Sequence, residues 1–306
     1  MLALSFFLIL AYSSLSWAQE EILIITSSKE AIYSEFAAHL KNQLIKSSNR
    51  DIQVQITSLE SVDGNRQLDH YSLVIAAGQR AAEHVLTLKQ NTNLLLTFIP
   101  SRVYFENMNE RYACNTITCS YLFLDQPPRR QFKLLRILFP ERKSIGMLTI
   151  SKTDSVLSEY QRAAKQLDFK LVPIPVSDTE QVVDALQENI HEIEILLSRP
   201  DPRIYNQNTA KGILLTTYYN RVPLLAYSSS FVKSGATAGL YSSLEDLARH
   251  AAEAALKQHD KHVKTPHYEY PKYFRVEVNT KVGDSLNLDL PPIEKVLEAL
   301  HDGDKQ

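Results

Sequence analysis

The strongest constraint on the fold is a regular alternation of strand-like and helix-like segments, which begins near residue 21 and starts again after residue 128. In the first half, strand-like runs occur at Glu21–Ile25, Ile52–Ile56, Leu73–Ala76 and Leu94–Ile99, and segments of helical periodicity at Ser27–Ser47 and Gln79–Leu88. This alternation is typical of a parallel sheet that helices cover on both faces. The first half is therefore expected to form one α/β lobe.

The alternation restarts after Asp125-Gln-Pro-Pro128, which ends the strand-like run Tyr121–Leu124. Strand-like runs follow at Ser144–Ile150, Lys170–Val176, Ile193–Ser198, Val222–Ala226, Thr237–Tyr241 and Tyr273–Asn279, and helical segments at Arg129–Leu138, Ser155–Leu167, Thr179–Ile190, Asn206–Tyr218, Leu244–Gln258 and Ile293–Leu300. The chain is long enough for two cores. We therefore expect two doubly wound parallel-sheet lobes of about equal size.

Candidate ligand-binding residues follow from this architecture, because ligands of open parallel sheets lie outside the carboxyl ends of the strands. Small or polar residues occupy six such ends, and from them we predict that the ligand is bound by Ser27, Ser28, Gly78, Gln79, Ser101, Ser151, Lys152, Asp201, Tyr227 and Ser228. N–H and hydroxyl groups at helix starts favour an anionic end such as a carboxylate, and Lys152 is expected to neutralise such a group. Capping a helix is the alternative role for any single serine.

The composition excludes several function classes. Glycine occurs only 8 times, and neither G-x-G-x-x-G nor G-x-x-x-x-G-K-[ST] is present, which excludes a glycine-built phosphate site. The net charge of −2 provides no basic field, so no nucleic-acid partner is expected. No G-x-S-x-G elbow is present. We expect neither enzymatic activity nor a cofactor.

A histidine-containing stretch near residue 260 is the one candidate for a metal site. His250, His259, His262 and His267 lie in it, but they lack the H-E-x-x-H spacing of a catalytic zinc site. We interpret the stretch as a solvated surface segment and expect no metal.

The N-terminus has the pattern of an export signal. Leu2–Leu10 is apolar apart from Ser5, and small residues at Ser16 and Ala18 suit cleavage after Ala18, which makes residues 1–18 a signal peptide. The apolar run is too short to span a bilayer, and no second run reaches that length. The product is therefore expected to be a soluble periplasmic protein that is not membrane-embedded. The alternative is that residues 1–18 form a buried strand or helix.

The two cysteines, Cys114 and Cys119, are too few for a structural zinc site. In an oxidising compartment we expect them to form a disulfide that closes a short loop. A redox-active pair is the alternative, although such pairs usually have C-x-x-C spacing.

Several motifs of the second half, together with Asp125-Gln-Pro and Arg130-Gln131, resemble one known family. These motifs are Leu197-Ser-Arg-Pro-Asp-Pro-Arg-Ile-Tyr-Asn206, Ile213-Leu-Leu-Thr-Thr-Tyr218, Arg221-Val-Pro-Leu224, Ser230-Phe-Val-Lys-Ser-Gly-Ala236, Asn279-Thr-Lys-Val282 and Leu288-Asp-Leu-Pro291. In this order they resemble the bacterial ABC-transporter substrate-binding proteins that include tryptophan- and tyrosine-binding members.

The resemblance implies a periplasmic-binding-protein fold of type I, in which two lobes are joined by three crossing strands. The crossings are expected near Tyr121–Leu124, Gly235–Tyr241 and Phe274–Asn279. Lobe one would comprise residues 19–122 and 241–270, and lobe two residues 123–240 and 271–306.

The implied function is capture of a small organic solute, such as an amino acid, in the cleft between the lobes for an ABC-type uptake system with a membrane permease. By position, Asp201 carries over as the partner of a ligand amine, with Tyr227 and Ser228 on the same side. The alternative is a regulatory module that binds solute and docks on a membrane receptor or signalling protein.

Overall fold

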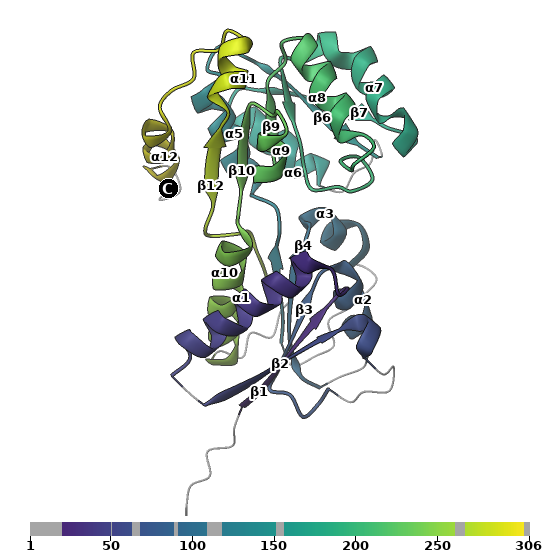
Figure 1. Ribbon diagram of the computed structural model, residues 1–306, viewed down its shortest axis with the longest axis vertical. Coiled ribbons are helices and arrows are strands. Elements are labelled where there is room, and N and C mark those ends of the chain that lie inside the picture. The colour runs from purple at the N-terminus through teal and green to yellow at the C-terminus, as the bar shows by residue number, and fades with distance from the viewer. Residues whose placement is uncertain are drawn as a thin grey trace, which may run out of the picture.

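The chain forms two lobes, one above the other in Figure 1, and each is built on a six-stranded sheet in this computed structural model. The structure describes residues 20–49, 51–62, 68–88, 91–108, 118–150, 156–260 and 267–302. The predicted signal peptide, Cys114, Ser151 and Lys152 lie outside these ranges. The pairing of Cys114 with Cys119 therefore stays a prediction, whereas the expectation of two α/β lobes is confirmed.

The sheet of lobe one is parallel throughout. Its strands run in the order β11 (His267–Glu269), β5 (Cys119–Phe123), β4 (Asn93–Ile99), β3 (Leu73–Ala77), β1 (Glu20–Thr26) and β2 (Ile52–Ser58), and the short helix η1 (Leu59–Ser61) follows β2. The helices α1 (Ala31–Ser47) and α10 (Leu244–Asp260) cover one face, and α2 (Gln79–Thr87), α3 (Ser101–Val103) and the π-helix η2 (Tyr104–Met108) cover the other. Both faces are thus buried, as a parallel sheet requires.

Lobe two repeats this strand order with one change at its edge. Its sheet runs β12 (Arg275–Val278), β10 (Ala238–Tyr241), β9 (Leu224–Ala226), β8 (Ile195–Leu197), β6 (Ser144–Thr149) and β7 (Lys170–Pro175), and only β12 is antiparallel to its neighbour. The helices are α5 (Pro128–Leu138), α6 (Leu157–Gln166), η3 (Thr179–Gln181), α7 (Val182–Asn189), η4 (Ile190–Glu192), α8 (Ala210–Tyr219), α9 (Ser229–Lys233), α11 (Thr280–Ser285) and α12 (Ile293–Asp302). The strand β11 was not predicted, because His267–Glu269 contains no apolar run.

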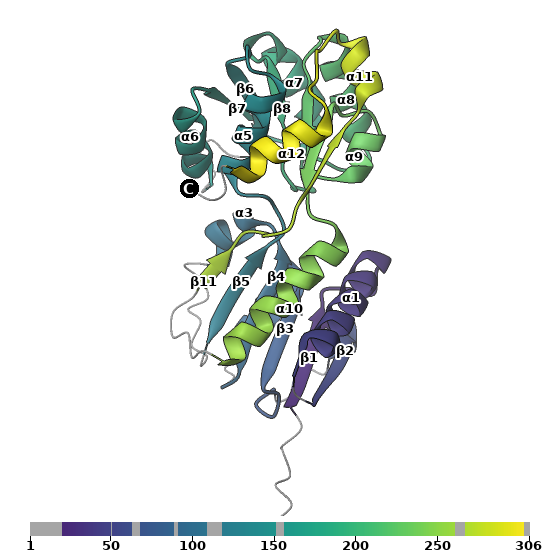
Figure 2. The same ribbon diagram turned by 90° about the vertical axis from the view of Figure 1, so that its left-hand side faces the viewer.

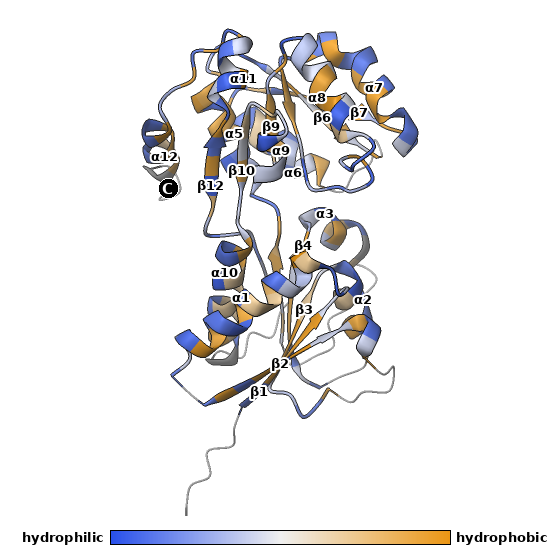
Figure 3. Ribbon diagram, viewed as in Figure 1, coloured by the Kyte–Doolittle hydropathy of each residue, from blue (hydrophilic) through white to orange (hydrophobic). Residues whose placement is uncertain are grey.

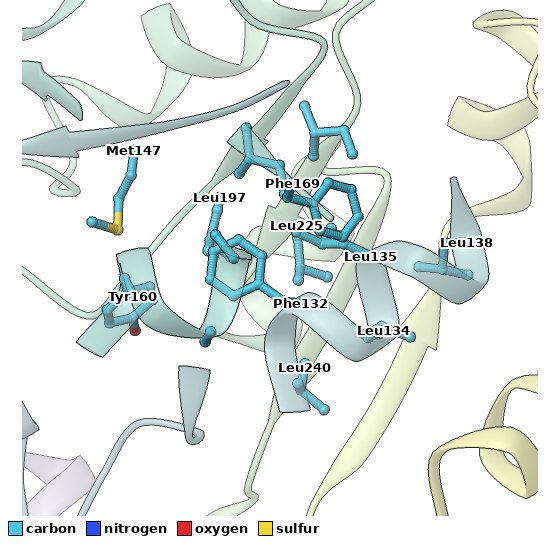
Figure 4. Close-up of a cluster of buried hydrophobic side chains, with 14 of the residues drawn as sticks. Phe132, Leu134, Leu135, Leu138, Met147, Tyr160, Phe169, Leu197, Leu225 and Leu240 are labelled. Atoms are coloured by element: carbon cyan, nitrogen blue, oxygen red, sulfur yellow. The ribbon is translucent and has the colours of Figure 1, made fainter. Parts of the chain in front are cut away.

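Each lobe has its own apolar core on both faces of its sheet. Figure 3 shows hydrophobic strands inside and helices of mixed polarity outside. In lobe two, α5, α6 and α12 pack on one face, and Phe132 lies at the centre of this cluster (Figure 4), with its ring centroid 5.9 Å from that of Phe169 and 6.2 Å from that of Tyr160. The buried residues of each core come from one lobe, although the partly buried Phe105 of lobe one also packs against the core of lobe two. The lobes can therefore move relative to each other without opening either core.

The chain passes between the lobes three times, at residues 124–127, 242–243 and 270–274, as Figure 2 shows. Hydrogen bonds join these crossings to one another. Gln126 Nε2 donates to Ser242 Oγ at 2.8 Å, and Ser242 Oγ donates to the Tyr273 carbonyl at 2.5 Å. Arg130 adds a bond to the Pro271 carbonyl at 2.8 Å. The three crossings therefore form one connected hinge. The crossings expected near Gly235–Tyr241 and Phe274–Asn279 lie instead at 242–243 and 270–274, because β10 and β12 belong to the sheet of lobe two. The residue limits expected for the two lobes stay a prediction.

Candidate ligand-binding site

A cavity of about 590 Å³ lies between the lobes, beside the hinge. Lobe one lines it with Ile32, Glu35, His39, Phe98, Leu244, Glu245 and Leu247; lobe two lines it with Gln131, Leu197, Ser198, Pro200, Leu225, Ala226, Tyr227, Ser228, Ser229, Ser230, Leu240 and Tyr241; and Leu124, Asp125, Gln126, Ser242, Ser243 and Arg275 complete it beside the crossings. Cavities of this volume hold small organic molecules. The surface of this lining is mainly apolar, although polar residues are about as numerous in it as apolar ones.

The wall from lobe two is the turn that follows β9. Tyr227 leaves the strand, and Ser228 begins α9, where its Oγ accepts a hydrogen bond from the Phe231 N–H at 3.3 Å. The Tyr227 ring is held edge-on by Tyr205, with centroids 5.8 Å apart. Burial, reinforced by the negative charge of Asp201, raises the pKa of Tyr227 above its ordinary value. Its hydroxyl therefore stays protonated and can both donate and accept hydrogen bonds.

The wall from lobe one comes from Phe98 and one side of α1. Phe98 is buried against Phe36, with ring centroids 4.9 Å apart, and it adopts φ +60°, where the register between β4 and β5 shifts. A bulky residue in this left-handed region is rare, and it marks a position that the surroundings enforce. Ile32 shares the apolar stripe of α1 with Phe36, Leu40 and Leu44, but it is 47% exposed and faces the cavity.

The floor of the cavity is polar and already hydrogen-bonded. Asp125 is buried, and its two carboxyl oxygens accept bonds from the Ser101 N–H at 2.6 Å and the Ser101 hydroxyl at 2.5 Å. Burial raises the pKa of Asp125 despite these bonds and the nearby positive charge of Arg199. Gln131 Nε2 donates to the Gln126 carbonyl at 2.6 Å and to Tyr160 Oη at 3.0 Å. These bonds fix the floor in one arrangement.

Four of the predicted residues lie together in lobe one but do not line the cavity. Ser27 Oγ accepts from the Ala81 N–H at 3.0 Å within the first turn of α2, and Gln79 Nε2 donates to Glu83 on the same helix at 2.8 Å. Gly78 has φ +96°, and a Cβ there would lie 2.5 Å from Ser27 Oγ. Ser28 Oγ accepts from the Glu30 N–H at 3.4 Å. These bonds and the close fit of Gly78 give all four a structural role, and their contact with ligand stays a prediction.

Asp201 lies in an ion cluster that joins the lobes. Its Oδ2 is 3.1 Å from Arg102 Nε of lobe one and 2.7 Å from Arg203 Nη2 of lobe two. Glu106 contacts Arg102 and lies 3.9 Å from Arg203. Burial alone would raise the pKa of Asp201, but the hydrogen bonds from Arg203 and the charge of Arg102 outweigh it and hold the pKa below its ordinary value. Both partners of Asp201 are thus supplied by the protein, and its bond to a ligand amine stays a prediction.

The interpretation of the histidine stretch as a solvated surface is wrong for His250, which is 6% exposed. His250 Nε2 lies 3.1 Å from Glu269, which also contacts His267 at 2.9 Å. The hydrogen bond from His250, followed by that from His267, lowers the pKa of Glu269 to about 2 although burial opposes the shift. No group of three or more His, Cys, Asp or Glu side chains suited to a metal occurs in the described part of the chain.

The family described as ABC transporter substrate binding protein matches residues 122–282, more than half of the chain. No curated protein sequence matches.

Solved structures of similar fold include two substrate-binding or ligand-bound bacterial proteins. A ligand-free, open substrate-binding protein with adhesive properties from Clostridium difficile is 18% identical, with TM-score 0.68 over 90% of this chain and 97% of its own. A protein from Streptococcus pneumonia in complex with L-Trp is 14% identical, with TM-score 0.63 over 92% of this chain and 98% of its own. At these identities the two structures establish the fold alone, which is the one predicted from the sequence.

Proposed function

Because the chain belongs to the ABC transporter substrate-binding protein family, we propose that it captures a small organic solute in the cavity between its lobes for an ABC-type uptake system. The observation that carries this proposal is that both lobes and the hinge line one cavity. A ligand there contacts both lobes, so it stabilises a conformation in which they approach each other. Binding requires no chemical step, in keeping with a family of solute-binding proteins.

Tyr227 and Ser228 are the sequence-predicted residues that we propose as direct ligand contacts, because both line the cavity. The Tyr227 ring offers an apolar face to the ligand, and its hydroxyl and the Ser228 hydroxyl offer hydrogen bonds. Ile32 and Phe98 supply the opposite apolar wall. Closure of the lobes would therefore enclose a ligand between an aromatic turn and the side of a helix.

Export to a periplasm is part of the proposal and rests on the signal pattern of residues 1–18. Within the described ranges, no helix is both long enough and apolar enough to cross a membrane. An exported receptor needs a permease to deliver its solute, and we propose such a membrane partner for this chain.

The proposal is tested by a thermal-shift screen of small organic solutes. A ligand that binds only the folded state stabilises it by about 2.7 kcal/mol at a hundred times its dissociation constant, so a true ligand raises the melting temperature. Tyr227→Ala should abolish that shift. Tyr219→Ala is the matched control, because Tyr219 is 76% exposed on α8 and outside the cavity. A shift that survives Tyr227→Ala unchanged would place the ligand elsewhere.

A further inference from the structure

The cavity is lined by more acidic than basic side chains. Among the described residues that line it, Glu35, Asp125 and Glu245 carry carboxylates, whereas Arg275 is the one permanent cation. His39 is the remaining titratable group, and its Nε2 lies 3.8 Å from Glu35 Oε1. Even without the buried Asp125, whose pKa is raised, the two glutamates outnumber the one arginine of the described lining.

Arg275 is already paired within the protein. Its Nε lies 2.7 Å from Asp246 Oδ2, and this bond joins β12 of lobe two to α10 of lobe one. Asp246 in turn accepts from the Ser243 hydroxyl at 2.6 Å, so the carboxylate is fixed at the start of α10. A ligand carboxylate would have to compete with this pair for the guanidinium, which weakens Arg275 as an anion-binding group.

The carboxylates lie at two levels of the cavity. Asp125 lies in the buried floor, where its oxygens accept bonds from the neutral N–H and hydroxyl groups of Ser101. Glu35 on α1 and Glu245 at the start of α10 lie at the exposed rim. Burial raises the pKa of Asp125 and Arg199 lies near it, so the electrostatic preference of the cavity comes from the rim. A cation is attracted there by Glu35 and Glu245, whereas an anion is repelled.

The aromatic residues of the walls favour the same sign of charge. Phe98 lies on the side of lobe one, and Tyr227 and Tyr241 lie on the side of lobe two. The faces of aromatic rings are electronegative and attract ammonium groups within about 6 Å. The Tyr241 hydroxyl lies 2.9 Å from Glu277 Oε2, so a further carboxylate stands behind this wall. The walls thus combine an apolar surface with attraction for a positive charge.

We propose that the cavity selects an apolar or aromatic amine that carries no carboxylate, with the ammonium group between the rim glutamates and the floor and the apolar body between Phe98 and Tyr227. This inference rests on the proposed function of the cavity as a solute site. It assigns a ligand chemistry different from the anionic end predicted from the strand termini, because Ser27, Gly78 and Gln79 lie outside the lining and Arg275 is paired.

Three probes of the same phenyl skeleton test the inference by calorimetry on the mature protein. We expect 2-phenylethylamine to bind on the order of tenfold more tightly than 3-phenylpropionate or L-phenylalanine, since the carboxylate of either competitor is repelled by the rim glutamates. Glu35→Gln and Glu245→Gln together should reduce the affinity for the amine several-fold and narrow its advantage over the acid. Glu188→Gln, an exposed position on α7 outside the cavity, is the matched control and should change neither.

Equal or tighter binding of 3-phenylpropionate or L-phenylalanine would overturn the inference. Loss of that binding in Lys152→Gln would further show that Lys152 supplies the anion site predicted from the sequence. If none of the three probes binds while another solute stabilises the protein in a manner that depends on Tyr227, the inference is wrong and the proposed function stands. If no solute of any charge does so, the proposed function fails as well.

Discussion

The two lobes share one strand order, yet they present different elements to the cavity. Lobe two presents a strand end, the turn from Tyr227 to Ser230 that follows β9. Lobe one presents Phe98 near the end of β4, but also the sides of two helices, α1 with Ile32 and the start of α10 with Glu245. The ends of β1 and β3 in lobe one serve to pack the lobe, because Ser27 is hydrogen-bonded to α2 and Gly78 fits closely against Ser27. A common topology therefore does not decide which elements meet the ligand.

The largest loss of stability is expected from a substitution at the end of β3 in lobe one, where Gly78 has a structural role. Gly78→Ala places a Cβ 2.5 Å from Ser27 Oγ and 2.6 Å from the Tyr33 ring, in a conformation with φ +96° and ψ 163° that is almost confined to glycine. We expect the free energy of unfolding, measured in urea, to fall by about 4 kcal/mol.

Gly235→Ala is the matched control in lobe two. Gly235 also has a positive φ, +125°, but the nearest heavy atom to its added Cβ is 4.0 Å away. This variant has the backbone strain without the clash, so it should cost about 1–2 kcal/mol. Equal costs for the two variants would contradict the structural role assigned to the end of β3.

A second prediction compares how two buried carboxyl groups, Asp201 of lobe two and Asp125 beside the hinge, contribute to stability as pH changes. Asp201 has a depressed pKa, so its contribution to stability is present above its unfolded pKa and is lost as pH falls through its folded value. Asp201→Asn should lower the free energy of unfolding by about 3 kcal/mol at pH 7, and the loss should shrink in acid.

Asp125 should behave in the opposite way. Its raised pKa means that its contribution is fully present below its unfolded pKa and is lost as pH rises through the folded value. The cost of Asp125→Asn should therefore decrease as pH rises, as urea titrations across the acid range would measure. Parallel pH profiles for the two variants would contradict the assigned environments.

The smallest effect is expected on ligand affinity, from a substitution in the apolar wall of lobe one. Ile32→Ala should weaken binding of the strongest solute about fivefold, since it removes apolar surface from the cavity. Stability should change by less than about 0.5 kcal/mol, because Ile32 is 47% exposed. Leu215→Ala, at a 42% exposed position on α8, is the control and should leave affinity unchanged. An unaltered affinity in Ile32→Ala would leave lobe two as the main source of binding.

The sequence was sufficient for the fold but only partly for the site. Periodicity predicted most strands and both sheets, because parallel strands buried on two faces leave long apolar runs such as Leu94–Ile99. The strand-end rule led to Tyr227 and Ser228, which line the cavity. It led equally to Ser27 and Gly78, whose packing roles depend on the helix that folds over them.

The contribution of α1 could not be predicted, for a related reason. Ile32 continues a stripe whose other members, Phe36, Leu40 and Leu44, are fully buried, so periodicity places it in the core. Its exposure depends on where the helix extends past its own sheet toward the other lobe, which is a tertiary property. Phe98 gave no signal either, since its left-handed backbone follows from the irregular pairing of β4 with β5.

Capture of a solute by closure of the two lobes is most directly tested by small-angle X-ray scattering. The strongest solute from the thermal screen should reduce the radius of gyration of the protein at saturation. The reduction should be absent in Tyr227→Ala and retained in Tyr219→Ala. A radius of gyration that is unchanged when the solute is fully bound would contradict closure around the cavity.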